Sequence, residues 1–259
     1  MRWDLPADLD AVQAMLAGRA GAWAMVLARV LGLCLTAPGL AVPMLGWRAR
    51  LMMSGLIGMV LVPVVGDRVA APPGWSGLAW GLAGEALTGG MLGLAAGLIV
   101  AGARAAGDLV AAQAGLSVTS LFDPEAGEEL TALGRLYGLL ALAAFAALGG
   151  PLALVGALAE SYSVRPAGGF ELSPAAAASV SGQVGKALEL ALRAAAPPAV
   201  ALVMAGIALA WLSRMSPSVP FLVLSLPIRL VVGMLLAILG ATALVMTFAG
   251  AWEALLGIG

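Results

Sequence analysis

Long uncharged apolar runs, separated by clusters of proline and glycine, dominate the chain. Three runs are long enough for a helix of about 20 residues that crosses a bilayer: 136–159, 194–213 and 230–252. The runs 51–66 and 86–103, and a first segment around 23–38 that Arg29 interrupts, are weaker candidates. Proline and glycine near residues 36–38, 71–74, 165–169, 196–198 and 215–217 predict the ends of these helices. The pattern therefore predicts an all-α integral membrane protein.

Composition strengthens this prediction and removes most chemistry. Of the 259 residues, 62% are apolar and 10% are charged, against about 45–50% and about 25% in soluble domains. The chain has no histidine and one cysteine, Cys34, so histidine catalysis and cysteine zinc clusters within one chain are excluded. With a net charge of −1, the chain lacks the excess of positive charge with which proteins bind the phosphates of nucleic acid. We expect no enzyme activity, no cofactor and no metal, and the acidic N-terminus predicts no cleaved signal peptide.

Arg29 and Asp108 are the charged residues that are candidates for burial within the apolar segments. Arg19 and Arg29 lie about 15 Å apart along one helix, so one of them is expected to lie deep. For Arg29, an ion pair or carbonyl contact with another helix and an exposed position at a helix end both remain open. Asp108 is the second candidate for a deep charge.

Two helical faces carry a repeat of small or polar residues. Gly89, Gly93, Gly97 and Ala101 recur every four residues, which favours close helix packing, although a glycine-rich composition also produces such ladders. From Ser179 to Arg193, polar residues line one face of an amphipathic helix, opposite Val180, Val184, Leu188 and Leu192. That polar face suits either solvent with local ion pairs or an aqueous pore or partner.

One stretch fits neither a span nor a free loop. It runs through Gly115, Leu116, Ser117, Val118, Thr119, Ser120, Leu121, Phe122, Asp123 and Pro124. It is too short to cross a bilayer and too apolar for an exposed loop. We expect it to be buried in protein or to line a cavity.

The order and spacing of several motifs resemble the FliR/SctT family of type III secretion export-gate subunits. The resemblance rests on Gly107-Asp108-Leu109-Val110, Gln113, Gly115-Leu116-Ser117 and Phe122-Asp123-Pro124, with Thr36-Ala37-Pro38 and Arg165-Pro166 before and after them. It continues in Arg214-Met215-Ser216-Pro217 and in Leu226-Pro227 through Gly233. The chain departs from the family pattern at Gly149-Gly150-Pro151 and at Ala114.

This resemblance implies a fold, a role and partners. The fold would be FliP-like helical hairpins over residues 1–173, with a pore plug loop at about 107–124, followed by a FliQ-like hairpin over residues 174–259. The inter-helix turn would involve Arg214, Met215, Pro217, Pro227 and Gly233, and prolines 217, 220 and 227 predict irregular backbone from Arg214 to Arg229.

The role implied is a non-enzymatic gating subunit in the bacterial inner membrane, at the flagellar basal body. There it would pass unfolded export substrates with FliP, FliQ and FlhB homologues. An injectisome SctT-type subunit is the alternative within the family. A secondary transporter of a small solute, suggested by the break at Ala196-Pro197-Pro198, is the alternative from another class.

Overall fold

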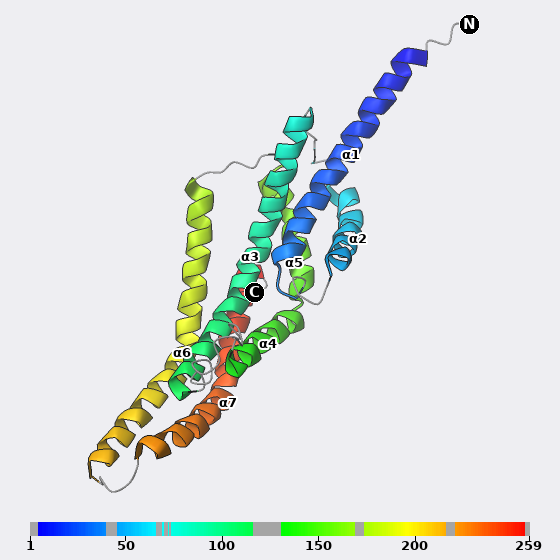
Figure 1. Cartoon of the computed structure of the whole chain (residues 1–259). Coiled ribbons are helices and arrows are strands. Elements are labelled where there is room, and N and C mark those ends of the chain that lie inside the picture. The colour runs from blue at the N-terminus through cyan, green and yellow to red at the C-terminus, as the bar shows by residue number, and fades with distance from the viewer. Residues whose placement is uncertain are drawn as a thin grey trace. The chain divides into compact units, whose positions relative to one another are not determined.

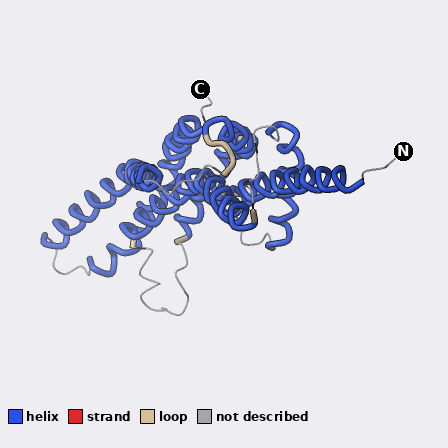
Figure 2. Tube along the Cα trace, turned by 90° about the horizontal axis from the view of Figure 1, so that it is seen from above, coloured by secondary structure: helices blue, strands red, loops and turns tan. Residues whose placement is uncertain are grey.

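The computed structural model describes residues 5–39, 46–65, 69, 72, 74–115, 131–168, 174–215 and 221–256. Within them, every regular element is a helix (Figure 2). In chain order (Figure 1) these are α1 (Leu5–Thr36), α2 (Trp47–Val65), α3 (Trp75–Ala114), α4 (Ala132–Ala147), α5 (Gly150–Val164), α6 (Pro174–Met215) and α7 (Phe221–Leu256). The all-α prediction is confirmed.

The lengths and hydropathies of the helices fit a membrane protein. Four described helices can cross a membrane, within Trp47–Val65, Trp75–Ala114, Val180–Met215 and Pro227–Glu253, and a fifth span is possible if α4 and α5 act together. The apolar part of α1, Ala20–Thr36, is shorter. The α7 span is only 12% buried by the rest of the chain, so most of its apolar surface is left for lipid or for partner chains.

The chain forms two compact units, and α3 contributes to both. Unit 1 comprises residues 1–97 and 151–180, and unit 2 comprises residues 98–150 and 181–259. In unit 1, α2 packs on α1, and in unit 2, α4 packs on α7. The predicted division into a FliP-like region, residues 1–173, and a FliQ-like region, residues 174–259, is a different one, and it stays a prediction.

Glycines bring α1 and α3 into backbone contact in unit 1. A Cβ atom on Gly89 would overlap the Arg29 carbonyl group, and one on Gly93 would overlap Thr36. The Thr36 hydroxyl lies 2.9 Å from the Gly90 carbonyl oxygen, so it can donate a hydrogen bond across the same contact. The spacing of four at Gly89, Gly93 and Gly97 therefore reflects close packing, whereas Ala101 is exposed.

The uncharged run 136–159 is not one helix, which corrects the expected single span. It breaks at residues 148–149, between α4 and α5. Gly149 has φ +70°, a left-handed conformation that favours glycine, and Gly150 has the Phe145 ring where a Cβ atom would lie. The Leu148 N–H donates to the Ala144 carbonyl oxygen at 3.0 Å, which closes the last turn of α4.

Three prolines expected to end helices lie inside them instead. Pro197 and Pro198 lie within α6, and Pro227 lies within α7. The prediction of irregular backbone up to Arg229 is therefore wrong from Phe221 onward. Proline removes a backbone hydrogen bond but does not have to end a helix, because packing in long apolar helices compensates for the loss.

The buried face of α6 also differs from the predicted one. Val184, Leu188 and Leu192 are exposed, whereas Ala187, Ala191 and Ala195 are buried. The reason is contact with α3, since a Cβ atom on Gly102 would lie 2.7 Å from the Ala187 carbonyl oxygen. Small side chains let the two backbones approach, and the larger apolar face is left outside.

Candidate functional site

In unit 2, Asp108, which lies in α3 six residues before its end, contacts Thr131, the N-cap residue of α4. Thr131 donates two hydrogen bonds to Asp108 Oδ1, from its hydroxyl at 2.6 Å and from its backbone N–H at 3.2 Å. The Thr131 hydroxyl also accepts from the Gly134 N–H at 3.0 Å, and so caps the N-terminus of α4. We call this arrangement the loop base. Asp108 is half-buried and holds a defined polar partner.

Glycines on both helices allow the loop base to form. Gly107 on α3 and Gly134 on α4 are both buried. A Cβ atom on Gly107 would lie 2.5 Å from the Leu133 carbonyl oxygen, and one on Gly134 would overlap the Asp108 carboxylate. Any side chain at these positions would push the two helices apart.

The plug loop is predicted at about 107–124, but residues 107–114 belong to helix α3. Of the plug residues 115–124, only Gly115 lies among the described residues. Gly115 follows the last turn of α3 with φ +81°, a conformation that favours glycine. The remaining plug residues, Leu116, Ser117, Val118, Thr119, Ser120, Leu121, Phe122, Asp123 and Pro124, lie outside the described part of the chain.

The residues predicted for the inter-helix turn lie at separate places. Arg214 and Met215 are exposed in the last turn of α6, and Pro217 lies outside the described residues. Gly233 is buried in α7, where a Cβ atom would lie 2.5 Å from Ala114 Cβ. Gly233 therefore belongs to the contact between α7 and Ala114, the last residue of α3, and not to the turn. Ala114 directly precedes Gly115.

Aromatic side chains hold α4 against α7 in the same unit. The Trp252 indole N–H donates to the Ala141 carbonyl oxygen at 3.2 Å, and the Tyr137 hydroxyl donates to the Ala237 carbonyl oxygen at 3.3 Å. The Phe145 and Trp252 ring centroids lie 4.4 Å apart. These contacts satisfy the polar atoms of two buried aromatic residues and fix the helix that follows the plug segment.

A second polar cluster lies in unit 1 around the predicted buried residue Arg29. Its Nε donates to Glu85 Oε2 at 2.5 Å, and both side chains are buried. Its remaining nitrogens donate to the Ser161 hydroxyl at 2.9 Å and to the Arg165 carbonyl oxygen at 3.2 Å. The Tyr162 ring lies 3.9 Å from the guanidinium carbon. Arg29 is thus buried and makes an ion pair and a carbonyl contact, and the alternative of an exposed position at a helix end is wrong.

Sequence reasoning missed Glu85, although a signal for it exists. Glu85 is the single charged residue between Arg68 and Arg104, within an apolar stretch. A lone carboxylate in such a helix calls for a buried cation. Its second oxygen accepts from the Gly168 N–H at 2.9 Å, which ties the segment after α5 to the cluster.

The described residues include neither a cluster of metal-ligating side chains nor an exposed thiol. No group of three or more histidine, cysteine, aspartate or glutamate side chains among them could hold a metal ion. Cys34 is free and buried, as expected for a small apolar residue.

Comparison with known proteins identifies the family. The family model described as bacterial export proteins, family 1, matches residues 20–255. The chain belongs to this export family. This assignment agrees with the resemblance of the motifs from Gly107 to Gly233.

Three relatives of this chain are named as flagellar proteins. Flagellar biosynthetic protein FliR of Escherichia coli is 30% identical over 208 residues, which cover 80% of this chain and 79% of that protein. FliR of Pectobacterium carotovorum is 29% identical over 207 residues, with the same coverage of each chain. FliR of Caulobacter vibrioides is 26% identical over 237 residues, covering 91% and 94%. Together with the apolar helices, these relatives indicate a membrane component of the flagellar export apparatus.

Proposed function

We propose that this chain is a structural and gating subunit of the flagellar protein export gate in the bacterial inner membrane. Its role is to pass unfolded export substrates across that membrane without catalysing a reaction. The segment that follows Gly115 acts as the plug that seals the pore at rest. Family membership and the flagellar relatives support the export role, and the loop base supports the gating role.

The single observation that carries the gating role is the loop base. The Asp108–Thr131 contact links the last part of α3 to the start of α4, between two helices in glycine-mediated contact. The 22 intervening residues comprise the last six residues of α3 and the segment that joins the two helices. A seal needs fixed ends, because a long untethered connection samples many positions and cannot hold an apolar plug in register. Apolar side chains such as Leu116, Val118 and Phe122 would then exclude water from a constriction.

The partners in this proposal are homologues of FliP, FliQ and FlhB. Support comes from the apolar surface that this chain leaves uncovered, above all on α7. The α6–α7 region is proposed to be the FliQ-like hairpin, and residues 1–173 the FliP-like region. Large exposed apolar residues recur along both helices, including Trp211, Leu235, Ile238 and Leu239. Such surface needs lipid or other helices against it.

A deletion of Gly115 to Leu121 tests the proposal. The deletion variant should assemble with FliP and FliQ homologues as the wild type does, while ion leak across the membrane rises. A matched control replaces the same residues by alternating glycine and serine, which keeps the segment length and removes the apolar side chains. That control should leak as well, because the proposal assigns the seal to apolar side chains. Normal assembly without added leak in both variants would refute the plug.

A further inference from the structure

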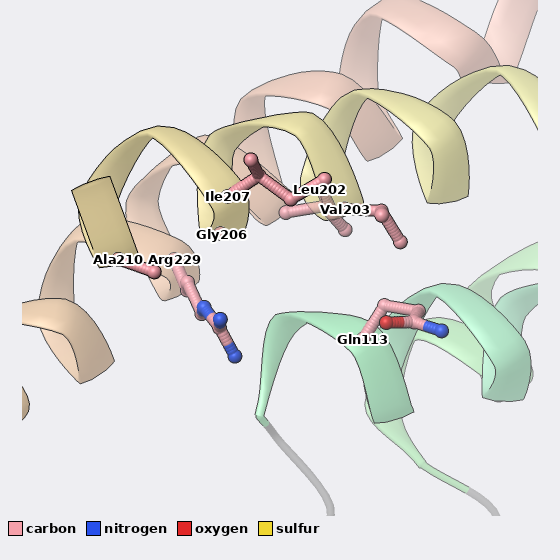
Figure 3. A pocket seen from close by; sticks show the side chains of 7 residues that line it. All are labelled: Gln113, Leu202, Val203, Gly206, Ile207, Ala210 and Arg229. Atoms are coloured by element: carbon pink, nitrogen blue, oxygen red, sulfur yellow. The ribbon is translucent and has the colours of Figure 1, made fainter.

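A cavity of about 330 Å³ lies in unit 2 between the end of α3, one face of α6 and the start of α7. One polar residue comes from α3 and one basic residue from α7, and α6 supplies five small or apolar residues. The lining residues are Gln113, Leu202, Val203, Gly206, Ile207, Ala210 and Arg229 (Figure 3). The cavity thus has an apolar wall along α6 and two polar side chains opposite it.

Arg229 is the one charged residue of this lining, and its hydrogen bonding is incomplete. Its Nε atom is buried, and no acceptor among the described residues lies within hydrogen-bonding distance of it. Gly206 makes room for the guanidinium, since a Cβ atom there would lie 2.6 Å from an Arg229 terminal nitrogen. The Arg229 residue as a whole is partly exposed, but a buried N–H group without an acceptor is costly, so the geometry calls for an anionic acceptor in the cavity. In Figure 3, Gln113 and Arg229 face the same space.

The α6 wall of the cavity belongs to a long apolar helix. Gln113 lies one residue before the last residue of α3, and Arg229 lies eight residues after the first residue of α7, Phe221. The α6 span ends at Met215, and Leu202 lies about 20 Å further into it. The wall from Leu202 to Ala210 therefore lies in a segment that is apolar enough to contact hydrocarbon.

We infer that this cavity binds a phospholipid, with its phosphodiester on Arg229 and one acyl chain along the α6 wall. Guanidinium groups bind phosphate oxygens through paired hydrogen bonds, which would satisfy the free Nε of Arg229. The Gln113 amide supplies a further donor for a phosphate or glycerol oxygen. The wall of Leu202, Val203 and Ile207 suits an alkyl chain, and a free anion or an acidic side chain of another protein would leave it uncovered.

Lipid retention by the purified particle that contains the tagged full chain tests this site. The particle is incubated with phosphatidylglycerol in mild detergent and washed, and bound lipid is counted by mass spectrometry. Arg229→Gln should retain lipid about tenfold more weakly, as expected for loss of a charge-assisted hydrogen bond. Arg214→Gln is the matched control, because it removes an exposed charge near the end of the α6 span that does not line the cavity. Equal retention by wild type and Arg229→Gln would overturn the inference.

Two further variants keep the test decisive if Arg229→Gln does not fold. Ile207→Trp fills the cavity and keeps the cation, so it should also lose the lipid. Arg229→Lys keeps the positive charge and should retain part of the bound lipid. Retention unchanged by Ile207→Trp would overturn the site.

Two competing occupants give different results. Inorganic phosphate at the same concentration should not displace the lipid, and efficient displacement would mean a free anion site. A benzoylphenylalanine crosslinker at Val203 should label lipid in membranes, whereas labelling of another protein there would assign the cavity to a partner chain. Either result would overturn the phospholipid site.

Discussion

Arg29 and Glu85, which lie 56 residues apart in the sequence, form a buried ion pair that joins α1 to α3. Ser161 and the Arg165 carbonyl oxygen on one side, and the Gly168 N–H on the other, complete the hydrogen bonds of the pair. The positive charge of Arg29 is thus compensated by the negative charge of Glu85 within an apolar helix contact. The cluster also ties the residues at the end of α5 to α1 and α3. A buried charge of this kind is stable only while its partner is present.

Glu85→Gln should therefore destabilise the protein strongly. The change leaves the Arg29 guanidinium buried without a counter-charge, which costs about 3–5 kcal/mol. The measurement is the melting temperature of the detergent-solubilised particle, followed by the loss of soluble tagged chain on heating.

The double variant Arg29→Met/Glu85→Met is the control for this prediction. It removes both charges together and should recover much of the lost stability, because apolar side chains can replace a buried pair. Equal loss in the single and double variants would mean that the pair does not couple the helices.

Gly89→Ala should separate α1 from α3. The added methyl group would overlap the Arg29 carbonyl, which is backbone and cannot move aside cheaply. We expect a loss of about 1–3 kcal/mol, as for other overpacked sites. Gly55→Ala in α2 is the matched control, since nothing lies within 4 Å of its Cβ position, and it should be neutral or stabilising by about 1 kcal/mol. A Gly89→Ala variant as stable as Gly55→Ala would contradict the contact.

Thr131→Val should loosen the loop base while keeping the shape of the side chain. The change removes the hydroxyl that donates to Asp108 and caps α4, at a cost of about 1 kcal/mol. If the segment after Gly115 seals the pore, ion leak across the membrane should rise without loss of assembly. Thr131→Ser keeps the hydroxyl and should leak no more than wild type. Equal leak in the valine and serine variants would separate the loop base from gating.

Gly149→Ala should disturb the break in the helix at the end of α4. Its φ of +70° is unfavourable for alanine, and the expected cost is about 1–2 kcal/mol. Gly156→Ala, within α5, is the control because its Cβ position is open. Limited proteolysis of the particle is the measurement, and faster cleavage near residue 149 is expected in the first variant alone. Similar protection in both variants would show that the break does not need glycine.

Local sequence features predicted the class of protein and many of its elements. The long runs near residues 194–213 and 230–252 lie in helices α6 and α7, because helix formation in an apolar segment depends on nearby residues. The glycine spacing on α3 predicted a contact face, and the isolated arginine at position 29 predicted a deep polar contact. The order of motifs from Gly107 to Gly233 indicated the export family that the comparison established.

The amino-acid sequence by itself thus determined a membrane-embedded, all-helical export protein, while the tertiary structure decided how its helices pair. Only the fold brings Glu85 to Arg29 and Thr131 to Asp108. Only packing decides that Pro197 and Pro227 lie within helices, whereas the chain breaks at residues 148–149. Packing also decides that α6 buries its alanine side chains and exposes the larger apolar ones. The physical reason is range: apolar content and helical period are set by neighbours in sequence, whereas partners and buried faces depend on contacts between residues far apart in the chain.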